Sequence, residues 1–140
     1  QSVDVSRVYI FRHVRITDEE VISSQIMEWT SRGIESESDN PELQDFPMID
    51  GGFQRWVDTL ERGDPVYGNV NEFPEGEQKI LKPQGIKSIL VVPLFIERSW
   101  WGFVGFDDCV RKRKWMDEEI AALTTASRLI ENVIVSKDSS

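Results

Sequence analysis

The side chains that could do chemistry in this sequence are few. Its 140 residues include one histidine, His13, and one cysteine, Cys109. A protein zinc site needs about four ligands, so these two residues cannot form one without several carboxylates, and we predict no metal site. An isolated imidazole can also bind haem iron, which makes His13 a candidate ligand. The alternative is an ordinary strand histidine, because the charged residues Arg12 and Arg15 lie close to it in the sequence.

Cys109 lies between a predicted strand and the basic run 111–114. Nearby positive charge lowers the pKa of a thiol and makes it reactive toward oxidants. An inert, half-buried thiol fits the same position, so a sensing role for Cys109 or His13 stays open at this point. A single cysteine excludes a disulfide within the chain and is typical of proteins in a reducing compartment, so we predict a cytoplasmic location.

Pairs of acidic residues at 19–20, 35–37 and 118–119 could take part in acid–base chemistry. Paired carboxylates act as acid and base when burial separates their pKa values. These pairs lie in predicted polar loops or at the start of a predicted helix, where solvent and the helix dipole stabilise the charged forms. No third group converges on them in the sequence. We therefore predict no catalytic residue and no enzymatic activity for this domain.

Two predicted β-hairpins, one near each end of the sequence, must position these side chains. Residues 7–15 alternate like a strand, and residues 22–30 return after the polar turn 17–20. Residues 89–96 are continuously apolar and rich in branched side chains, which favours a strand buried on both faces. The strand 100–106 follows, and its two glycines leave room for the close approach of a bulky group.

The middle of the sequence predicts short elements. Residues 53–60 carry their apolar side chains on one helical face. A short edge strand is expected at 66–70, and a loop at 31–40. A brief helix then begins at Pro74 and must end before Pro83, because proline suits a first helical turn and disrupts a helix interior.

A long amphipathic helix ends the sequence. Apolar residues recur at helical spacing over 117–135, and Asp117 is placed to act as the N-cap. Together with the hairpins, this pattern predicts an α+β fold with a single central antiparallel sheet of five to six strands and helices on both faces. We predict one domain over residues 3–135 and a flexible tail over residues 136–140.

The charge and composition exclude several classes of partner. The formal net charge is −9 at pH 7, whereas nucleic-acid binding needs a concentrated basic face, so we predict no nucleic-acid partner. No run is long and apolar enough to cross a bilayer, and we predict no membrane contact by this domain. The chain begins with Gln1 rather than Met, so we expect it to be a module of a longer polypeptide.

Five blocks of residues follow one another in an order that is typical of one family. They are Ser6–Phe11, Glu28-Trp29 with Gly33-Ile34, Trp56 with Leu60–Val66, Gly85–Leu94, and Trp101–Asp107 followed by Trp115. Over about residues 5–135 the chain thereby resembles a GAF domain, a module with a GAF/PAS-like fold that senses small molecules and dimerises in signalling proteins. The likeness is greatest to the GAF domains found in prokaryotic sensor histidine kinases and diguanylate cyclases.

The resemblance implies a non-catalytic sensory module of a multidomain signal-transduction protein, such as a two-component system. A small molecule would bind between the sheet and the mid-chain helices and would alter the ordering of residues 31–84. The hairpin 89–107 would carry this change into the helix 117–135 and on to a neighbouring domain of the parent chain. The ligand-binding residues that the resemblance implies are aromatic: Tyr9, Phe11, Trp29, Phe46, Phe53 and Trp56.

A different interpretation of the same residues stays open. The six rings could simply fill the core, because large aromatic side chains dominate cores as well as pockets. The domain would then be a ligand-free structural dimerisation or spacer domain in the same kind of protein. Family members usually open with a helix that joins the C-terminal helix in a dimer contact. The sequence has almost no residues before Val3 that could form this first helix. We therefore treat a homodimer as a possible partner that an experiment must test.

The motifs that fix the chemistry of better-known GAF subfamilies are absent from the sequence. The cyclic-nucleotide signature is missing, and residues 107–110 do not supply the cysteine context of the bilin-binding members. The methionine sulfoxide reductase members use several cysteines, whereas this chain has one. The resemblance therefore predicts a ligand and leaves its identity, and that of any cofactor, unknown.

Overall fold

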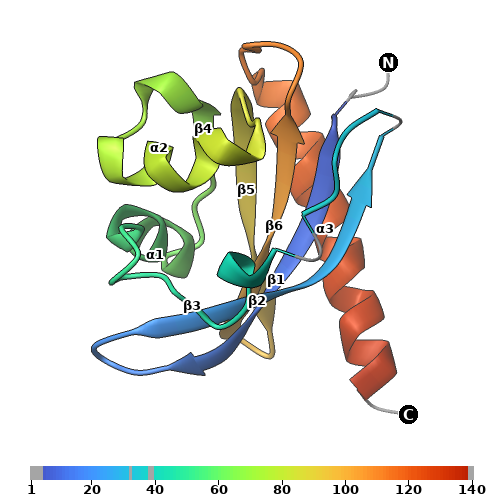
Figure 1. Ribbon diagram of the computed structural model, residues 1–140. Helices are drawn as coiled ribbons and strands as arrows, with labels where there is room; N and C mark the ends of the chain where they lie inside the picture. Colours follow the sequence, from blue (N-terminus) through green and yellow to red (C-terminus); the bar gives the residue numbers. More distant parts are fainter. Residues whose placement is uncertain (1–4, 32, 38–39, 139–140) are drawn as a thin grey trace.

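The computed structural model describes residues 5–31, 33–37 and 40–138 and contains a six-stranded sheet with helices on both faces (Figure 1). The strand order is β3-β2-β1-β6-β5-β4, and every neighbouring pair is antiparallel. The α+β fold and both hairpins predicted from the sequence are confirmed. The strands are β1 (Arg7–Ile16), β2 (Val21–Thr30), β3 (Phe46–Pro47), β4 (Val66–Asn69), β5 (Ser88–Ile96) and β6 (Ser99–Asp108).

Two short helices and one long helix cover opposite faces of this sheet (Figure 1). Both α1 and α2 lie on one face, together with short 3₁₀ turns, and α3 lies on the other. We call the segments 41–62 and 70–84, which cover the first face, the roof. The helices are α1 (Gln54–Glu61), α2 (Glu75–Leu81) and α3 (Asp117–Asp138), and the 3₁₀ turns are Pro41–Leu43, Val70–Glu72 and Lys82–Gln84.

The ends of α3 differ from the sequence prediction. Met116, not Asp117, caps the helix: its carbonyl accepts from the Ile120 N–H at 3.0 Å, and its own N–H donates to the Glu119 carboxylate at 2.9 Å. The helix continues to Asp138, because no Gly or Pro interrupts it, so residues 136–138 are helical and not the predicted tail. Residues 139–140 lie outside the described residues.

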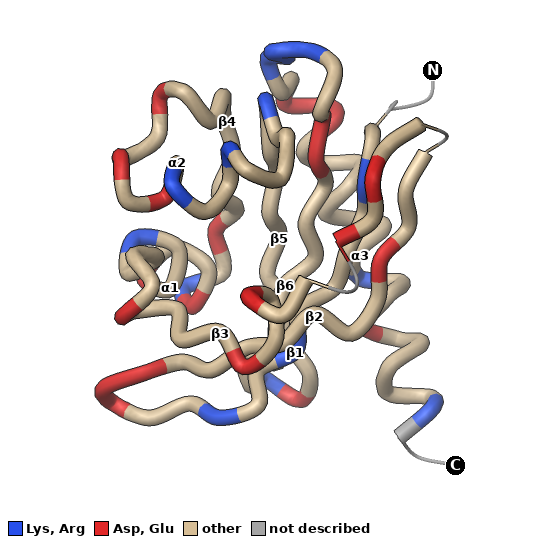
Figure 2. Tube along the Cα trace, viewed as in Figure 1, with Lys and Arg blue, Asp and Glu red and all other residues tan. Residues whose placement is uncertain are grey.

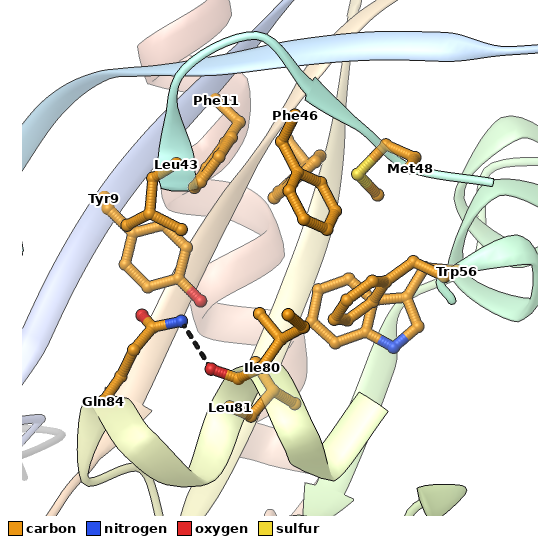
Figure 3. Close-up of a pocket in the computed structure, with 11 residues that line it drawn as sticks. Tyr9, Phe11, Leu43, Phe46, Met48, Trp56, Ile80, Leu81 and Gln84 are labelled. Carbon is orange, nitrogen blue, oxygen red and sulfur yellow. Dashed lines mark hydrogen bonds between the residues drawn. The ribbon is translucent and has the colours of Figure 1, made fainter. Parts of the chain in front are cut away.

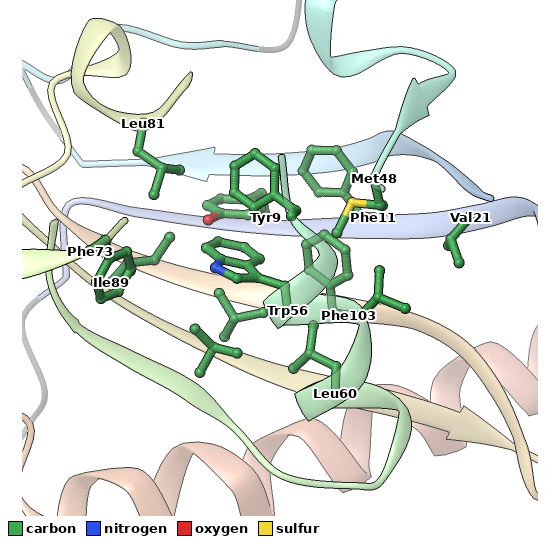
Figure 4. Packing of buried hydrophobic residues seen from close by; sticks show 14 of the residues in the cluster. Tyr9, Phe11, Val21, Met48, Trp56, Leu60, Phe73, Leu81, Ile89 and Phe103 are labelled. Carbon is green, nitrogen blue, oxygen red and sulfur yellow. The ribbon is translucent and has the colours of Figure 1, made fainter. Parts of the chain in front are cut away.

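Side-chain alternation along the strands divides the core into two layers. On the roof side, Tyr9, Phe11 and Phe103 pack against Trp56 and Leu60 of α1 (Figure 4). The layer on the α3 side contains Ile10, Leu90, Val92, Leu94, Val104, Phe106 and Trp115, with Ile120, Leu123, Ile130 and Ile134 of α3 packed against them. The sheet therefore separates the roof from α3 and contacts both.

Gly105 allows a tyrosine to lie flat against the sheet. Tyr9 and Gly105 are direct partners in the β1–β6 pairing, and a Cβ atom on Gly105 would overlap the Tyr9 ring. A Cβ atom on Gly102 would likewise overlap the backbone carbonyl of Phe11. The prediction that these glycines admit a bulky neighbour is confirmed, and at Gly105 that neighbour is a residue of the candidate site.

Candidate functional site

A small cavity lies between the roof and the sheet (Figure 3). Its volume is about 40 Å³. The strands β1 and β6 form its floor, and α1, α2 and the segments around β3 form its walls. The eleven residues that line it are Tyr9, Phe11, Leu43, Phe46, Met48, Phe53, Trp56, Ile80, Leu81, Gln84 and Phe103.

The aromatic residues of the lining hold one another in place. The rings of Phe11 and Phe103 are stacked, with centroids 4.9 Å apart and planes 13° from parallel. Phe53 meets the rings of Trp56 and Phe46 edge to face, at centroid distances of 4.7 and 5.7 Å. Such pairs are favourable beyond the area that they bury, and together they form a wall of ring faces and ring edges.

Five of the six aromatic residues predicted from the sequence line this cavity, and Trp29 does not. Ile26 is an extra residue in β2, where the register shifts opposite Ile10 and Phe11. Such a bulge turns the side chains that follow it to the other face of the sheet. Trp29 consequently pairs with Val8 on the α3 side and is 54% exposed. The prediction that Trp29 joins the other five rings is wrong.

Six lining residues were not predicted from the sequence: Leu43, Met48, Ile80, Leu81, Gln84 and Phe103. Phe103 lies two residues from Gly105 and therefore on the same face, so strand alternation contained a signal for it. Gln84 follows a proline in a polar stretch, and nothing in the local sequence indicates that it reaches a cavity.

The polar groups of the lining are the Tyr9 hydroxyl and the Gln84 amide. Tyr9 donates a hydrogen bond to the Asp107 carboxylate at 3.0 Å. The Gln84 side-chain nitrogen donates to the backbone carbonyl of Ile80 at 3.0 Å (Figure 3). The Tyr9 hydroxyl proton and one of the two Gln84 amide N–H groups are therefore engaged within the protein, and the oxygen atoms of the two side chains remain as acceptors.

A buried ion pair beneath Tyr9 ties the roof to the sheet. The Arg7 guanidinium donates to Asp107 at 3.3 Å and to the backbone carbonyls of Gln84 at 3.0 Å and Glu35 at 3.3 Å. Burial raises the pKa of Asp107 to about 7, although Arg7 and the Tyr9 hydroxyl favour its charged form. Burial and the neighbouring Asp107 also raise the pKa of Tyr9 well above its ordinary value.

A second buried carboxylate joins the two roof helices. Glu77 of α2 is 1% exposed and accepts two hydrogen bonds from Arg55 of α1, at 2.6 and 3.0 Å. It also accepts from the indole nitrogen of Trp56 at 2.9 Å. The Arg55 guanidinium lies 4.9 Å from the centre of the Phe73 ring. These contacts orient Trp56, which forms one wall of the cavity.

Comparison with known proteins decides the family. A sequence profile of the GAF domain matches residues 1–134. The chain belongs to the GAF domain family. Over 135 residues, or 96% of its length, this GAF domain is 41% identical to the methanogenesis regulatory histidine kinase FilI of Methanothrix harundinacea. It spans about 15% of the length of that relative.

Solved structures with low sequence identity share the fold of this GAF domain. The PixJ GAF domain of Thermosynechococcus elongatus, in its blue-light absorbing form, matches with a TM-score of 0.72 at 18% identity, covering 96% of this chain and 79% of the other. A domain of a putative two-component sensor histidine kinase from Sinorhizobium meliloti 1021 matches with a TM-score of 0.67 at 16% identity, covering 96% and 82%. None of the helices in the described part of the chain is both long and apolar enough to cross a membrane.

The loop between β6 and α3 links the sheet of the GAF domain to its last helix. Arg113, in the basic run that Figure 2 shows at one end of the molecule, lies 3.6 Å from the Asp108 carboxylate and 3.4 Å from that of Glu119 in the first turn of α3. Its guanidinium also lies 4.6 Å from the centre of the Trp115 ring. Asp108 is 1% exposed and accepts the backbone N–H of Arg111 at 2.9 Å.

Farther along α3, a second set of contacts holds the helix on β5. The pairing of β5 with β6 shifts register after Leu94, and the Phe95 N–H donates instead to the Glu131 carboxylate at 2.7 Å. Arg128 donates to the backbone carbonyl of Pro93 at 2.9 Å and pairs with Glu131 at 3.0 Å. Polar contacts therefore hold α3 in place near its beginning, at Glu119, and again beyond its middle, at Arg128 and Glu131.

The histidine and the cysteine do not join the cavity. His13 contacts the Ser23 hydroxyl at 2.6 Å and the edge of the Trp100 ring, and burial lowers its pKa to about 4. Burial raises the pKa of the Cys109 thiol, which favours the inert, half-buried thiol of the two interpretations left open by the sequence. Among the described residues, no group of three or more His, Cys, Asp and Glu side chains could hold a metal ion.

Proposed function

We propose that this GAF domain is the sensory module of a longer signal-transduction protein, and that a small molecule binds in the cavity between the sheet and the roof. The observation that carries the proposal is the cavity itself, which is lined by eleven residues from both layers. The likeness to part of the histidine kinase FilI supports a histidine kinase as the parent chain, with a diguanylate cyclase as the alternative. The single cysteine of the sequence fits a reducing, cytoplasmic location.

Binding requires the roof to move. A cavity of about 40 Å³ holds a few water molecules, whereas pockets for small ligands usually measure about 300–1,000 Å³. The roof consists of short helices, 3₁₀ turns and the two-residue strand β3, which pairs with β2 at the edge of the sheet. Buried polar contacts join the roof to itself through Glu77 and to the sheet through Arg7. A ligand that fits only the opened roof shifts the domain toward that state, and this differential affinity is the source of the signal.

The end of β6 supplies a route for the signal across the sheet. Asp107 faces the roof side, where it binds Tyr9 and Arg7. The next residue, Asp108, faces the loop that leads to α3 and lies 3.6 Å from Arg113. Because successive strand residues point to opposite faces, a displacement of Asp107 by the roof also displaces Asp108. Hydrogen exchange in a variant of Arg113 tests this route.

A thermal-shift screen of nucleotides, haem, amino acids and aromatic metabolites tests the binding proposal. A ligand at about 100 times its Kd stabilises the folded state by about 2.7 kcal/mol and raises the melting temperature. Ile80→Trp fills the cavity from α2 and should abolish the shift, whereas the exposed substitution Gln54→Leu should not. A screen in which no compound stabilises the wild-type chain counts against sensing by ligand binding.

A second function, a ligand-free structural dimerisation or spacer domain, is favoured by a separate observation. The outer side of α3 exposes Leu129 and Val133, which lie four residues apart on one helical face. Such a stripe suits contact with a second copy, and the small cavity agrees with a core that is filled by its own rings. A chain that dimerises through α3 and binds nothing in the screen would support this function.

A further inference from the structure

We infer that the cavity takes a small, flat, uncharged ring that carries an O–H or N–H donor, as indole and phenol do. This inference rests on the proposed function, because it names the ligand class for the same cavity. It follows from the charge, the shape and the hydrogen-bonding groups of the lining.

The lining excludes a charged ligand. None of its eleven residues carries a charged side chain. The nearest buried carboxylates are already satisfied, because Asp107 binds Arg7 and Tyr9, and Glu77 binds Arg55 and Trp56. An ion placed among these side chains would lose its hydration without gaining a partner, which is strongly unfavourable. Nucleotides, free amino acids and carboxylates are therefore poor ligands.

The shape of the lining favours a planar ring. The stacked pair of Phe11 and Phe103 lines the cavity from the sheet, and Phe46, Phe53 and Trp56, which meet edge to face, line it from the roof. Figure 3 shows Phe11, Phe46 and Trp56 of this set. Aromatic rings pack favourably against one another in offset and edge-to-face arrangements. A flat ligand can extend this set of contacts, whereas a branched aliphatic chain of similar volume cannot.

The polar side chains of the lining favour a donor on the ligand. Tyr9 donates its hydroxyl proton to Asp107, so it offers a ligand only its oxygen as an acceptor. Gln84 uses one N–H on the Ile80 carbonyl, so it offers its side-chain oxygen as an acceptor and its second N–H as a donor. A ring with an O–H or N–H group can donate a hydrogen bond to one of these oxygen atoms. A hydrocarbon ring would bury both oxygen atoms without a hydrogen bond.

The cavity is too small for a ring, so a side chain of the roof must move before a ring can bind. A cavity of about 150 Å³ binds benzene in another protein, so about 40 Å³ is too small for a ring without movement. Ile80 is only partly buried and belongs to the short helix α2. Shortening this side chain to alanine opens the cavity, so Ile80→Ala is the variant in which binding should be tightest.

The test is a titration of the chain, followed by ¹H–¹⁵N NMR, with indole, its donor-free analogue indene, and the charged indole-3-acetate. We expect indole to bind about fivefold more tightly than indene, as one net hydrogen bond allows, with larger affinities in Ile80→Ala and no binding of indole-3-acetate. The indole N–H signal of Trp56 should shift. Gln84→Leu should reduce the advantage of indole over indene, and the exposed control Gln54→Leu should preserve it.

Three results would overturn the inference: equal binding of indole and indene, tighter binding of indole-3-acetate, or no ring binding to either the wild-type chain or Ile80→Ala. Its failure is distinguishable from failure of the proposed function. If the thermal-shift screen finds a charged ligand in the cavity, sensing stands and the ring inference falls. If indole binds as expected but the amide signals of α3 do not respond, the ligand class stands and the relay falls.

Discussion

Glu77 is a buried carboxylate that joins the two helices of the roof at the scale of single residues. We predict that Glu77→Gln lowers the free energy of unfolding by about 2 kcal/mol, because a neutral amide cannot accept all the hydrogen bonds that Arg55 and Trp56 donate. The loss stays below that of a fully buried pair, since the Arg55 side chain is 42% exposed.

Urea unfolding measures this loss, and Glu75→Gln is the matched control, because Glu75 lies exposed in the first turn of the same helix. Equal destabilisation by the two substitutions would mean that the contacts of Glu77 are not what holds α1 to α2.

Asp107 and His13 make opposite contributions to the pH dependence of stability. Folding raises the pKa of Asp107 to about 7, so its contribution to stability is full below about pH 4 and is lost as the pH rises toward 7. Folding lowers the pKa of His13 to about 4, so its contribution is full above about pH 6.5 and is lost as the pH falls toward 4. Between about pH 4 and 6.5 the two slopes cancel.

Removal of the imidazole should expose the slope that belongs to Asp107. We predict that the free energy of unfolding of His13→Asn falls as the pH rises from 4.5 to 6.5, by up to about 1.4 kcal/mol per pH unit. The wild-type chain should vary much less over the same range. Urea unfolding at three pH values makes the comparison, and parallel pH profiles of the two proteins would contradict it. Asp107→Asn should change the profile in the opposite direction.

Arg113 acts at the scale of elements, because it connects the end of β6 with the first turn of α3. We predict that Arg113→Ala weakens this turn by about 1 kcal/mol, so that its backbone amides exchange with solvent about fivefold faster. The Ile120 amide, which donates to the Met116 carbonyl, is the most direct probe. Lys114→Ala is the matched control, since this exposed neighbour belongs to the same basic run.

Hydrogen exchange followed by NMR distinguishes a local effect from a global one. Exchange in β5 should stay unchanged in Arg113→Ala if the contact orders only the start of the helix. A uniform rise across the sheet would show that Arg113 supports the whole fold and would remove it from the proposed route to α3.

The elements themselves could be predicted from the sequence where one physical pattern dominates. The apolar run of β5 reflects burial on both faces of a strand, and the helical periodicity of α3 reflects burial along one stripe of a helix. The position of Trp29 could not be predicted in this way. A single extra residue in β2 turns the side chains that follow it to the opposite face of the sheet. Bulges depend on the partner strand, which local sequence does not specify.

The candidate site was predictable to a similar extent. The five aromatic residues that line it have large side chains of the kind that dominate cores and pockets, and the strand pattern placed Tyr9 and Phe11 on one face. The Gln84 amide and the pair of Arg7 and Asp107 could not be foreseen. Arg7 and Asp107 are 100 positions apart in the chain, and only the β1–β6 pairing brings them together.

The whole molecule presents α3 as a helix with two different sides. Ile120, Leu123, Ile130 and Ile134 pack on the sheet. On the other side, Leu129 and Val133 are 63% and 57% exposed, and Ala122 and Ala126 continue the same line at spacings of four and three residues. This spacing of three and four is the repeat of a coiled-coil seam, which buries its apolar positions only against a partner helix.

We therefore predict that the chain forms a homodimer through α3 and that Leu129→Glu makes it monomeric, because two like charges would meet in a desolvated seam. Sedimentation velocity over a range of concentrations measures the change. Val110→Glu is the matched control, since Val110 is 65% exposed but lies in the loop before the helix. Both substitutions are at exposed positions, so the circular dichroism of the monomer should match that of the wild-type chain.

The result bears on how a signal leaves the domain. In a dimer joined by this seam, a shift of α3 on one sheet changes its packing against the partner's α3, so both copies respond to one ligand. If the wild-type chain sediments as a monomer at every concentration, α3 must pass the change to a following segment without a partner. The polar contacts of Arg113, Arg128 and Glu131 would then connect the sheet with the helix and transmit the change.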